Sequence, residues 1–337
     1  MLNVKDIQAF FSTPINSGVA KSLYDLLQTV PGFVRVRDDN GAEELNWSML
    51  QEYYSICQKM CDDLLLVNVN PNLVIPVENK YIAVPHTVSS VPAELEDMLE
   101  YGYYDFKYRG FVYVRDYFTN SVLAIDGIKP DGNPDIGTAF YIGNRRYVTA
   151  AHCVKDYSKF RLLKPDGSPI ALKEVWFAKG FDTNAYDLAI IIVDDESDIP
   201  EFKMADPAVL DDVLVMGYPP VSGFNAIQTA ETATVGAYQK SSTGQVVGAD
   251  KSYLLPLDFF LINARVKGGN SGGPVINNTG YVIGVVVKLP FDNQSDSNGP
   301  RYDLMGYGVC QPSKYIRQLM DNPDIMMLTY EDGYYRL

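Results

Sequence analysis

A single serine stands among four glycines in the stretch "KGGNSGGPV", residues 267–275. Glycine permits backbone angles and close approaches that side chains forbid, so this composition is typical of a turn that presents the serine hydroxyl. Ser271 is therefore a candidate nucleophile for acyl transfer, and an ordinary loop serine is the alternative. The N–H groups of Gly269 and Ser271 predict an oxyanion hole, whose donors stabilise negative charge developing on a carbonyl oxygen.

A serine nucleophile needs a base within about 2.6–3.2 Å of its hydroxyl and a carboxylate that orients this base. The chain has two histidines. His86 lies between prolines in "AVPHTV", in a part of the chain without other catalytic signals. His152 follows "RYVTAA", where a strand runs into a turn of small residues. We therefore expect His152 to be the base.

The carboxylate is expected at Asp187, directly ahead of the aliphatic run Leu188 to Val193. At the rim of a packed strand, this side chain would be buried and fixed by hydrogen bonds. Asp194 and Asp195 follow the same run and are the alternatives, which we expect to be solvated.

The letters "GNSGG" also satisfy G-x-S-x-G, the nucleophile elbow of α/β-hydrolases. That fold requires the chain order serine, acid, histidine. No histidine follows Ser271, and the order here is His152, Asp187, Ser271. The elbow interpretation is therefore excluded.

Short apolar runs must position these three residues. From about residue 118, runs such as "TAFYIG", "LAIIIV" and "VLVMGYP" alternate with Gly, Pro, Asn and Asp, as in an all-β sandwich or barrel. A last helix is expected at "SKYIRQLMDN", where Tyr315, Ile316 and Leu319 form one apolar stripe. The tail, residues 323–337, is apolar and aromatic enough to pack onto the body.

The first part of the chain, residues 1–117, is predicted to be a mixed, mostly helical domain. One helical face runs from Val19 to Val30, and a second helix, from Met49 to Leu64, follows Asn46 as a cap. A third runs from Pro92 toward Tyr101. No motif in this segment indicates a chemical function. We therefore expect it to regulate the chain or to bind a protein partner.

Composition excludes several partner classes. The net charge of −14 repels nucleic acid. No apolar run approaches the roughly 18 residues that span a bilayer, and the start "MLNVKDIQAFF" lacks the basic and apolar regions of a signal peptide. The sequence therefore predicts a cytoplasmic protein that binds neither membranes nor nucleic acid.

The four cysteines, Cys57, Cys61, Cys153 and Cys310, show no regular spacing and favour reduced thiols over a disulfide framework. Cys57 and Cys61, four apart on a helix, could share a metal ion, but no histidine lies near them in sequence. We interpret them as buried apolar residues and expect neither metal nor cofactor.

Three motifs carry a resemblance to a known family. The stretches "TAAHC" (149–153), "DLAII" (187–191) and "GNSGGP" (269–274) resemble the trypsin/chymotrypsin-like serine peptidases, whose motifs read T-A-A-H-C, D-[IL]-A and G-[DN]-S-G-G-P. In motif style the chain is nearest to HtrA/Deg-type and glutamyl endopeptidase-like members. The resemblance covers about residues 118–322. It implies a chymotrypsin-like domain of two six-stranded β-barrels, so that the chain is α+β overall.

By this resemblance the chain is an intracellular serine endopeptidase that hydrolyses protein or peptide substrates. Ser271 would attack the carbonyl, His152 would accept and return the proton, and Asp187 would hold the imidazole tautomer. Asn270 stands where secreted zymogens need an Asp for activation, and Cys153 lacks their partner cysteine. The oxyanion turn is therefore expected to be preformed, or to be ordered by residues 1–117 or a partner.

The resemblance also implies a substrate-binding set, namely Arg265, Val287, Lys288 and Leu289. Arg265 stands six residues before Ser271, at the base of the family's primary pocket, and Lys288 would add a second positive charge. Together they favour cleavage after Glu or Asp, because arginine pairs with carboxylates in a bidentate manner. The alternative is that Arg265 turns outward into a surface ion pair.

Two further functions are consistent with the fold. A protease-fold binding module without activity would be indicated by a missing catalytic residue or oxyanion glycine, and none is missing from the sequence. An esterase would use the same three residues on small acyl substrates. Peptide and ester turnover separate these alternatives.

Overall fold

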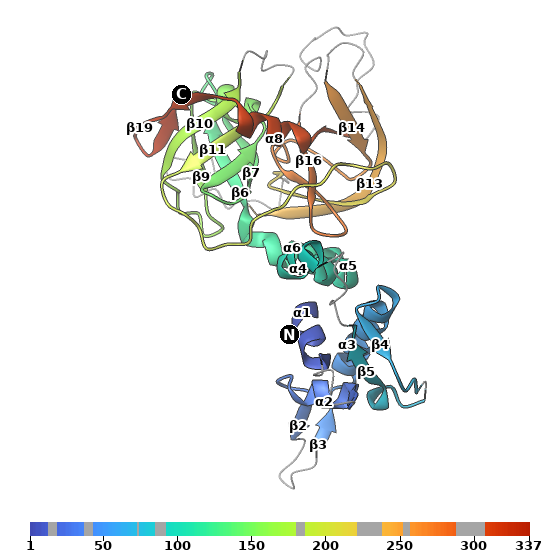
Figure 1. Cartoon of the computed structure of the whole chain (residues 1–337). Coiled ribbons are helices and arrows are strands. Elements are labelled where there is room, and N and C mark those ends of the chain that lie inside the picture. The colour runs from blue at the N-terminus through green and yellow to red at the C-terminus, as the bar shows by residue number, and fades with distance from the viewer. Residues whose placement is uncertain are drawn as a thin grey trace. The chain divides into compact units, whose positions relative to one another are not determined.

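The computed structural model describes residues 1–12, 19–36, 43–72, 74–84, 92–179, 186–220, 238–251, 257–287 and 307–337. The chain divides into two compact units, Met1–Gly110 and Phe111–Leu337 (Figure 1). The sequence places the boundary after residue 117, whereas the structure includes the helix Phe111–Phe118 in the second unit. In the described part of the chain, no helix has the length and apolar character needed to cross a bilayer.

The helices described in the first unit are α1 (Val4–Phe11), α2 (Leu23–Gln28), α3 (Trp47–Asp62), α4 (Pro92–Tyr101) and α5 (Tyr103–Arg109), together with the 3-10 turn η1 (Pro76–Glu78). The first three, α1 to α3, begin at polar caps. Asn46 accepts a hydrogen bond from the Met49 N–H at 3.2 Å, as the sequence predicts, and Asn3 and Ser22 each complete a capping box.

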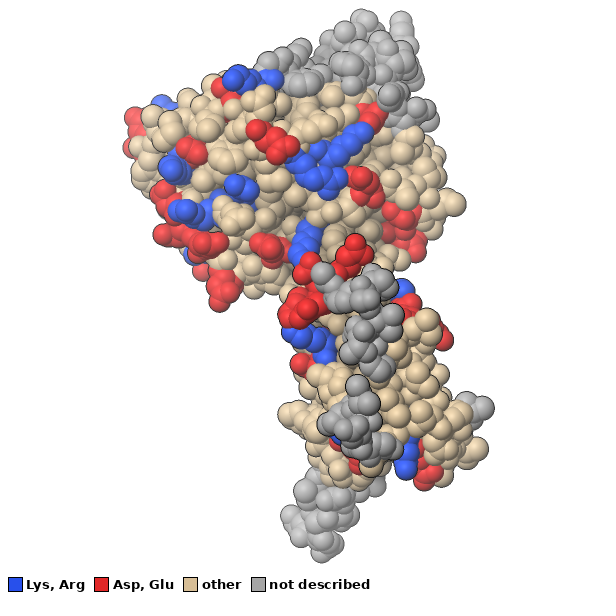
Figure 2. Space-filling model, in the orientation of Figure 1, with Lys and Arg blue, Asp and Glu red and all other residues tan. Residues whose placement is uncertain are grey.

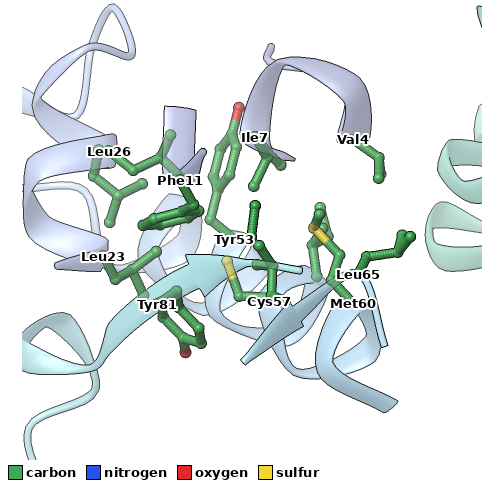
Figure 3. Close-up of a cluster of buried hydrophobic side chains, with 14 of the residues drawn as sticks. Val4, Ile7, Phe11, Leu23, Leu26, Tyr53, Cys57, Met60, Leu65 and Tyr81 are labelled. Carbon is green, nitrogen blue, oxygen red and sulfur yellow. The ribbon is translucent and has the colours of Figure 1, made fainter. Parts of the chain in front are cut away.

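Two small antiparallel sheets complete this unit. One has the strand order β1-β5-β4 and the other pairs β2 with β3. The strands are β1 (Lys21–Ser22), β2 (Val34–Val36), β3 (Glu43–Leu45), β4 (Leu66–Asn68) and β5 (Lys80–Ala83). Figure 3 shows side chains from α1, α2, α3 and β5 converging on one core, in which Phe11, Cys57 and Tyr81 are fully buried.

Two predicted helical positions lie outside the helices. Val19 is exposed and precedes α2, and Leu64 is exposed because the chain turns out of α3 at a left-handed residue with φ of 59°. The apolar stripe therefore extends beyond the helices it predicts, since spacing alone does not mark where a helix ends.

The first sheet of the second unit has the strand order β18-β10-β11-β8-β7-β6-β9-β20-β19. The strands are β6 (Val122–Ile128), β7 (Pro134–Tyr141), β8 (Arg146–Thr149), β9 (Lys159–Leu163), β10 (Leu172–Ala178), β11 (Ala189–Val193), β18 (Pro323–Met327), β19 (Thr329–Glu331) and β20 (Tyr334–Arg336). Six of them, from β10 to β9 in this order, form a barrel that is nearly closed.

The C-terminal tail covers the edges of this barrel. Strand β18 pairs with β10, and β20 pairs with β9 through Tyr335 and Phe160. The tail thus supplies hydrogen-bonding partners to the two strands that would otherwise be the edges of the sheet, and unpaired edges promote aggregation.

The second sheet is a closed barrel with the order β12-β13-β14-β17-β16-β15. Its strands are β12 (Asp212–Gly217), β13 (Lys240–Lys251), β14 (Asp258–Ile262), β15 (Pro274–Asn277), β16 (Val282–Val286) and β17 (Gly308–Pro312). The predicted two-barrel, chymotrypsin-like fold is confirmed. Helix α8 (Lys314–Asp321) follows, with Tyr315, Ile316 and Leu319 buried as the sequence predicts.

Helix α6 (Phe111–Phe118) and the 3-10 turn η2 (Thr119–Ser121) lead into β6. Phe118 is fully buried and its ring stacks on Phe202 with centroids 3.9 Å apart. Gln239 donates hydrogen bonds to the carbonyls of Thr119 (3.0 Å) and Val122 (3.2 Å). The helix is therefore part of the second unit, although the three sequence motifs do not extend to it.

Replacing Phe118 with alanine is expected to lower the free energy of unfolding by about 3–5 kcal/mol, because it removes a buried ring and leaves a cavity. Val112→Ala, on the exposed side of the same helix, is the matched control. Urea unfolding of the second unit is followed by the fluorescence of Trp176 in a Trp47→Phe background. Equal midpoints for the two variants would contradict the prediction.

Candidate active site

His152 and Asp187 are joined by two hydrogen bonds. The His152 ring atom Nδ1 lies 2.7 Å from Asp187 Oδ2, and the His152 backbone N–H donates to Asp187 Oδ1 at 2.9 Å. The pairing of β8 with β11 brings them together, because Thr149 lies opposite Ala189 in that ladder. His152 follows β8 as the first residue of the short helix α7 (His152–Lys155), and Asp187 precedes β11.

The carboxylate of this pair is shielded from solvent. Asp187 is 6% exposed, whereas Asp194 and Asp195 beyond the other end of β11 are exposed. His86, the second histidine of the chain, lies outside the described residues.

The environment of His152 has opposing effects on its pKa. Burial of the ring lowers the pKa, whereas the neighbouring Cys153 and the hydrogen-bonded Asp187 carboxylate raise it. The net effect holds the pKa of His152 above its ordinary value of 6.5. The imidazolium form is therefore stabilised beside Asp187.

The turn that carries Ser271 is fastened to the first barrel through Thr138 of β7. The Thr138 N–H donates to the carbonyl oxygen of Ser271 at 2.9 Å, and Thr138 Oγ1 donates to the carbonyl oxygen of Gly269 at 2.6 Å. The hydroxyl of Thr149, at the end of β8, donates to the Thr138 carbonyl oxygen at 2.7 Å. A continuous chain of hydrogen bonds thus connects the strand before His152 to the turn of Ser271.

Gly272 permits this contact. Its φ is +81°, and a Cβ atom there would lie 2.2 Å from both the Thr138 carbonyl oxygen and Thr149 Oγ1. Gly269 has a φ of +92° and would place a Cβ 2.6 Å from the Tyr218 carbonyl oxygen. Side chains at these two positions would separate the turn from the strands that hold it.

The backbone of the turn is partly satisfied by its own hydrogen bonds. The Asn270 N–H donates to the Lys267 carbonyl at 3.0 Å, and the Gly273 N–H donates to the Asn270 carbonyl at 2.8 Å. The backbone N–H groups of Gly269 and Ser271 donate no hydrogen bond to any of the described residues. These are the two donors that the sequence predicts for an oxyanion hole.

Ser271 is half-buried next to the His152–Asp187 pair. Cys153, the neighbour of His152, lies with Sγ 3.5 Å from the carbonyl oxygen of Ser271. Among the described residues, no hydrogen bond joins the Ser271 hydroxyl to the His152 ring. The structure therefore joins the base to the acid directly and brings the serine backbone beside the base.

The predicted substrate-binding residues have different positions. Arg265 is exposed, and no ion pair links it to another described residue, so the predicted alternative of a surface ion pair finds no partner in that part of the chain. Val287 is buried, and its N–H donates to the Val309 carbonyl at 3.0 Å. Lys288 and Leu289 lie outside the described residues.

Thr138 and Tyr218 are positioning residues that lie outside the three sequence motifs, and Thr149 is a third that opens "TAAHC" but has no role assigned there. The Tyr218 N–H donates to the Gly269 carbonyl at 3.3 Å, and the two threonines are fully buried. A threonine within the apolar run "TAFYIG" is a weak signal, because a buried hydroxyl needs a partner. The signal does not reveal that the partner is a turn about 130 residues away.

Within the described residues, no group of three or more His, Cys, Asp or Glu side chains is placed to hold a metal ion. Cys57 and Cys61 are free thiols of the first unit, and burial raises the pKa of both.

Comparison with known proteins places this site in a family. Residues 137–285, which include His152, Asp187 and Ser271, match the family described as "Trypsin-like peptidase domain". The chain is 33% identical over 151 residues to a probable periplasmic serine endoprotease DegP-like of Rhizobium meliloti (strain 1021), covering 44% of this chain and 27% of that protein.

A protein of the same name from Chlamydia trachomatis serovar D is 28% identical over 222 residues, covering 64% of this chain and 40% of the relative. The chain thus spans well under half of these relatives. Among solved structures, the active form of the Rv3671c protease from Mycobacterium tuberculosis has a TM-score of 0.48 and 24% identity, covering 62% of this chain and 83% of that one.

These relatives contradict the predicted cytoplasmic location, because four of them are named probable periplasmic serine endoproteases. The intracellular location of the predicted enzyme is likewise not supported by these relatives. Reduced cysteines do not indicate an intracellular location in this chain, for a physical reason. Cys57, Cys153 and Cys310 are free but buried, so packing protects these thiols in any compartment.

The resemblance of the three motifs to trypsin-like peptidases is confirmed by the family match and by the two barrels between which the matched residues are divided. The His152–Asp187 pair comes from the first barrel and the glycine-flanked Ser271 from the second. Residues 137–285, which hold all three residues, are therefore similar to the trypsin-like peptidase domain.

Proposed function

We propose that the chain is a serine endopeptidase that cleaves protein or peptide substrates through His152, Asp187 and Ser271. The observation that carries this proposal is the hydrogen-bonded His152–Asp187 pair, with the turn of Ser271 fixed beside it by Thr138. The relatives are named serine endoproteases, which agrees with this chemistry.

In the proposed reaction Ser271 Oγ attacks the carbonyl carbon of the scissile bond while His152 accepts the hydroxyl proton. Asp187 accepts from Nδ1, which leaves Nε2 as the nitrogen that receives this proton. The imidazolium then protonates the leaving amine, and an ester forms on Ser271. Water, deprotonated by His152, hydrolyses that ester and restores the serine.

The developing oxyanion would be bound by the N–H groups of Gly269 and Ser271. Both belong to a turn whose carbonyls are held by Thr138 and Tyr218, so these donors are oriented before the substrate binds. Preorganised donors of this kind are worth about 10²–10³ in rate each.

The Ser271 hydroxyl and the imidazole need a short approach for proton transfer. In enzymes without bound substrate this contact is often long and tightens when substrate binds. The half-buried position of Ser271 leaves its hydroxyl accessible to a peptide carbonyl.

Replacing Ser271 with alanine is expected to lower kcat for peptide hydrolysis by about 10⁶, since the three residues act as a unit. Ser158→Ala, an exposed serine ahead of β9, is the control and should leave kcat unchanged. Turnover of a peptide and of a matched ester is measured for each protein, with labelling by a fluorophosphonate probe.

Equal labelling of the Ser271 variant and the wild type would refute the proposed nucleophile. Absence of both turnover and labelling in the wild type would favour the inactive binding module. Ester turnover without peptide turnover would favour the esterase.

The pH dependence of kcat/KM follows from the raised pKa of His152. The base must be neutral to accept a proton, so activity is lost as pH falls through this pKa. Because the net shift is upward, we expect the acidic limb above pH 6.5. Asp187→Asn removes a charge that raises this pKa and should move the limb to lower pH while reducing kcat by about 10⁴.

Profiles of kcat/KM between pH 5 and 9, a range of about two units around the ordinary histidine pKa, measure both effects. An acidic limb below pH 6.5 that the Asp187 variant leaves in place would exclude His152 as the titrating base.

We further propose that the enzyme prefers Glu or Asp before the cleaved bond. Arg265 supports this preference, as an exposed cation six residues ahead of Ser271 in an acidic chain. A guanidinium pairs with a carboxylate through two hydrogen bonds, and such contacts are worth about 1.5–3 kcal/mol.

Cleavage of a peptide library should therefore show acidic residues at this position, and Arg265→Gln should reduce the preference for Glu over Gln at least tenfold. Lys173→Gln, an exposed lysine of β10, is the control of equal charge change. A preference for small aliphatic residues would reject the acidic pocket.

Regulation by the first unit or by a protein partner that it binds is also proposed. The second unit begins at Phe111, so the fragment to compare with the full chain starts there and not at residue 118. Equal kcat/KM of the fragment and the full chain would exclude control by the first unit alone.

A further inference from the structure

A cavity of about 260 Å³ lies beside the nucleophile turn. Its lining includes Lys240, Ser242, Arg265, Lys267 and Asn270. Of the described residues, those lining the cavity include neither His152 nor Ser271, although Arg265 is the residue proposed above to select acidic substrates. The cavity therefore adjoins the proposed catalytic residues and shares one residue with the proposed specificity pocket.

Two parts of the second barrel form its walls. The ladder of β12 and β13 places Ser242 opposite Val215 and Lys240 opposite Gly217. The other wall is the segment from Arg265 to Asn270, which leads directly to Ser271. A ligand in the cavity would thus contact both a rigid ladder and the turn that carries the nucleophile.

Three of the lining residues are cations, and no lining residue among those described is an aspartate or glutamate. This concentration of positive charge contrasts with the chain as a whole, whose net charge is −14. Figure 2 shows acidic and basic side chains interspersed on the visible face of the molecule. Cations gathered without a lining carboxylate repel one another, and an anion between them relieves this repulsion.

The hydroxyl of Ser242 provides a second, independent observation. Its Oγ is buried and has no hydrogen-bond partner among the described residues. An unsatisfied buried hydroxyl costs about 1–3 kcal/mol, so such a group in a native structure calls for a partner. Since a hydroxyl can donate, the oxygen of a bound anion would satisfy it.

Lys240 is held at the cavity by its own contacts. Its Nζ donates to the Pro219 carbonyl at 3.1 Å, and burial lowers the pKa of this lysine. Desolvation of a cation is offset when an anion binds beside it. The amide of Asn270, which is 5% exposed, adds a neutral polar group to the same wall.

We propose that this cavity binds a compact oxyanion, a phosphate or carboxylate group, and that its occupancy stabilises the turn of Ser271 and raises catalytic activity. The coupling is direct, because the Lys267 carbonyl accepts from the Asn270 N–H at 3.0 Å and the Asn270 carbonyl accepts from Gly273 at 2.8 Å. An anion held by Lys267 and Asn270 therefore restrains the backbone that orients the Gly269 and Ser271 N–H groups.

Binding is tested on the full chain by calorimetric titration with inorganic phosphate, and in parallel with acetate and glutamate, at ionic strength fixed with chloride. Because the Ser271→Ala variant keeps the cavity, it should bind as the wild type does, whatever the outcome of the activity assays. Tighter binding of phosphate than of both carboxylates identifies phosphate as the ligand group, and the reverse order identifies a carboxylate.

The variants Lys240→Gln and Lys267→Gln should each weaken binding of the preferred anion about tenfold or more, as expected for loss of a charge-assisted hydrogen bond. Ser242→Ala should weaken it severalfold, and Lys173→Gln should leave it unchanged. Thermal unfolding without anion identifies any variant that fails to fold. The proposal is then tested by the anion affinities of the variants that do fold. No saturable binding, or equal weakening by Lys173→Gln, would overturn the proposal.

The activity effect rests on the proposed peptidase function and is measured separately. At saturating anion kcat/KM for a peptide should rise severalfold, and in Ser242→Ala the same rise should require a severalfold higher anion concentration. Competition between the anion and the substrate would show that the cavity is the subsite for an acidic side chain, and so would overturn a separate regulatory site. Binding without any change in kcat/KM would overturn the coupling. Binding to a protein that hydrolyses no peptide would refute the peptidase and leave the anion site intact.

Discussion

The candidate site depends on Thr138, a fully buried residue whose backbone and side chain both contact the turn of Ser271. Its N–H and hydroxyl donate to the carbonyls of Ser271 and Gly269, and its own carbonyl accepts from Thr149. These groups are removed from water, so each would cost about 1–3 kcal/mol if left unpaired. The two barrels therefore cannot shift against each other at this point without losing several hydrogen bonds at once. Positioning of the serine is a consequence of this constraint.

A second constraint fixes the base. Asp187 accepts from both the backbone N–H and the ring of His152, so it determines the orientation of the imidazole as well as its charge. This carboxylate lies just ahead of β11, whose pairing with β8 leaves it no freedom to move relative to His152. The same burial that fixes the pair also strengthens its electrostatics, because solvent does not screen the interaction. The orientation of the ring and part of the upward effect on its pKa thus come from the same carboxylate.

Local chemistry made part of this structure predictable from the sequence. Asn46 predicts the start of a helix, because its side chain caps the first turn. The glycines around Ser271 predict a tight turn, because a side chain at Gly269 or Gly272 would clash with neighbouring atoms. Pairings between distant segments were not predictable in this way. The tail strands β18 and β20 complete the first sheet, and Thr138 reaches a turn in the other barrel, through contacts that no local pattern encodes. The sequence places residues 111–117 in the first domain, because no local pattern shows which unit the helix α6 belongs to.

The residue before the nucleophile connects the catalytic turn to the cationic cavity. Asn270 is almost completely buried and lines that cavity, with its Oδ1 close to Gly217, where a Cβ would lie 2.6 Å away. An aspartate at this position would place a carboxylate among Lys240, Arg265 and Lys267 and would neutralise part of their charge from within the chain. The amide has nearly the same shape but no charge, so the three cations keep their capacity to attract an external anion. With the proposed anion site, the identity of this one side chain would decide whether the negative charge beside these cations comes from the chain itself or from a ligand.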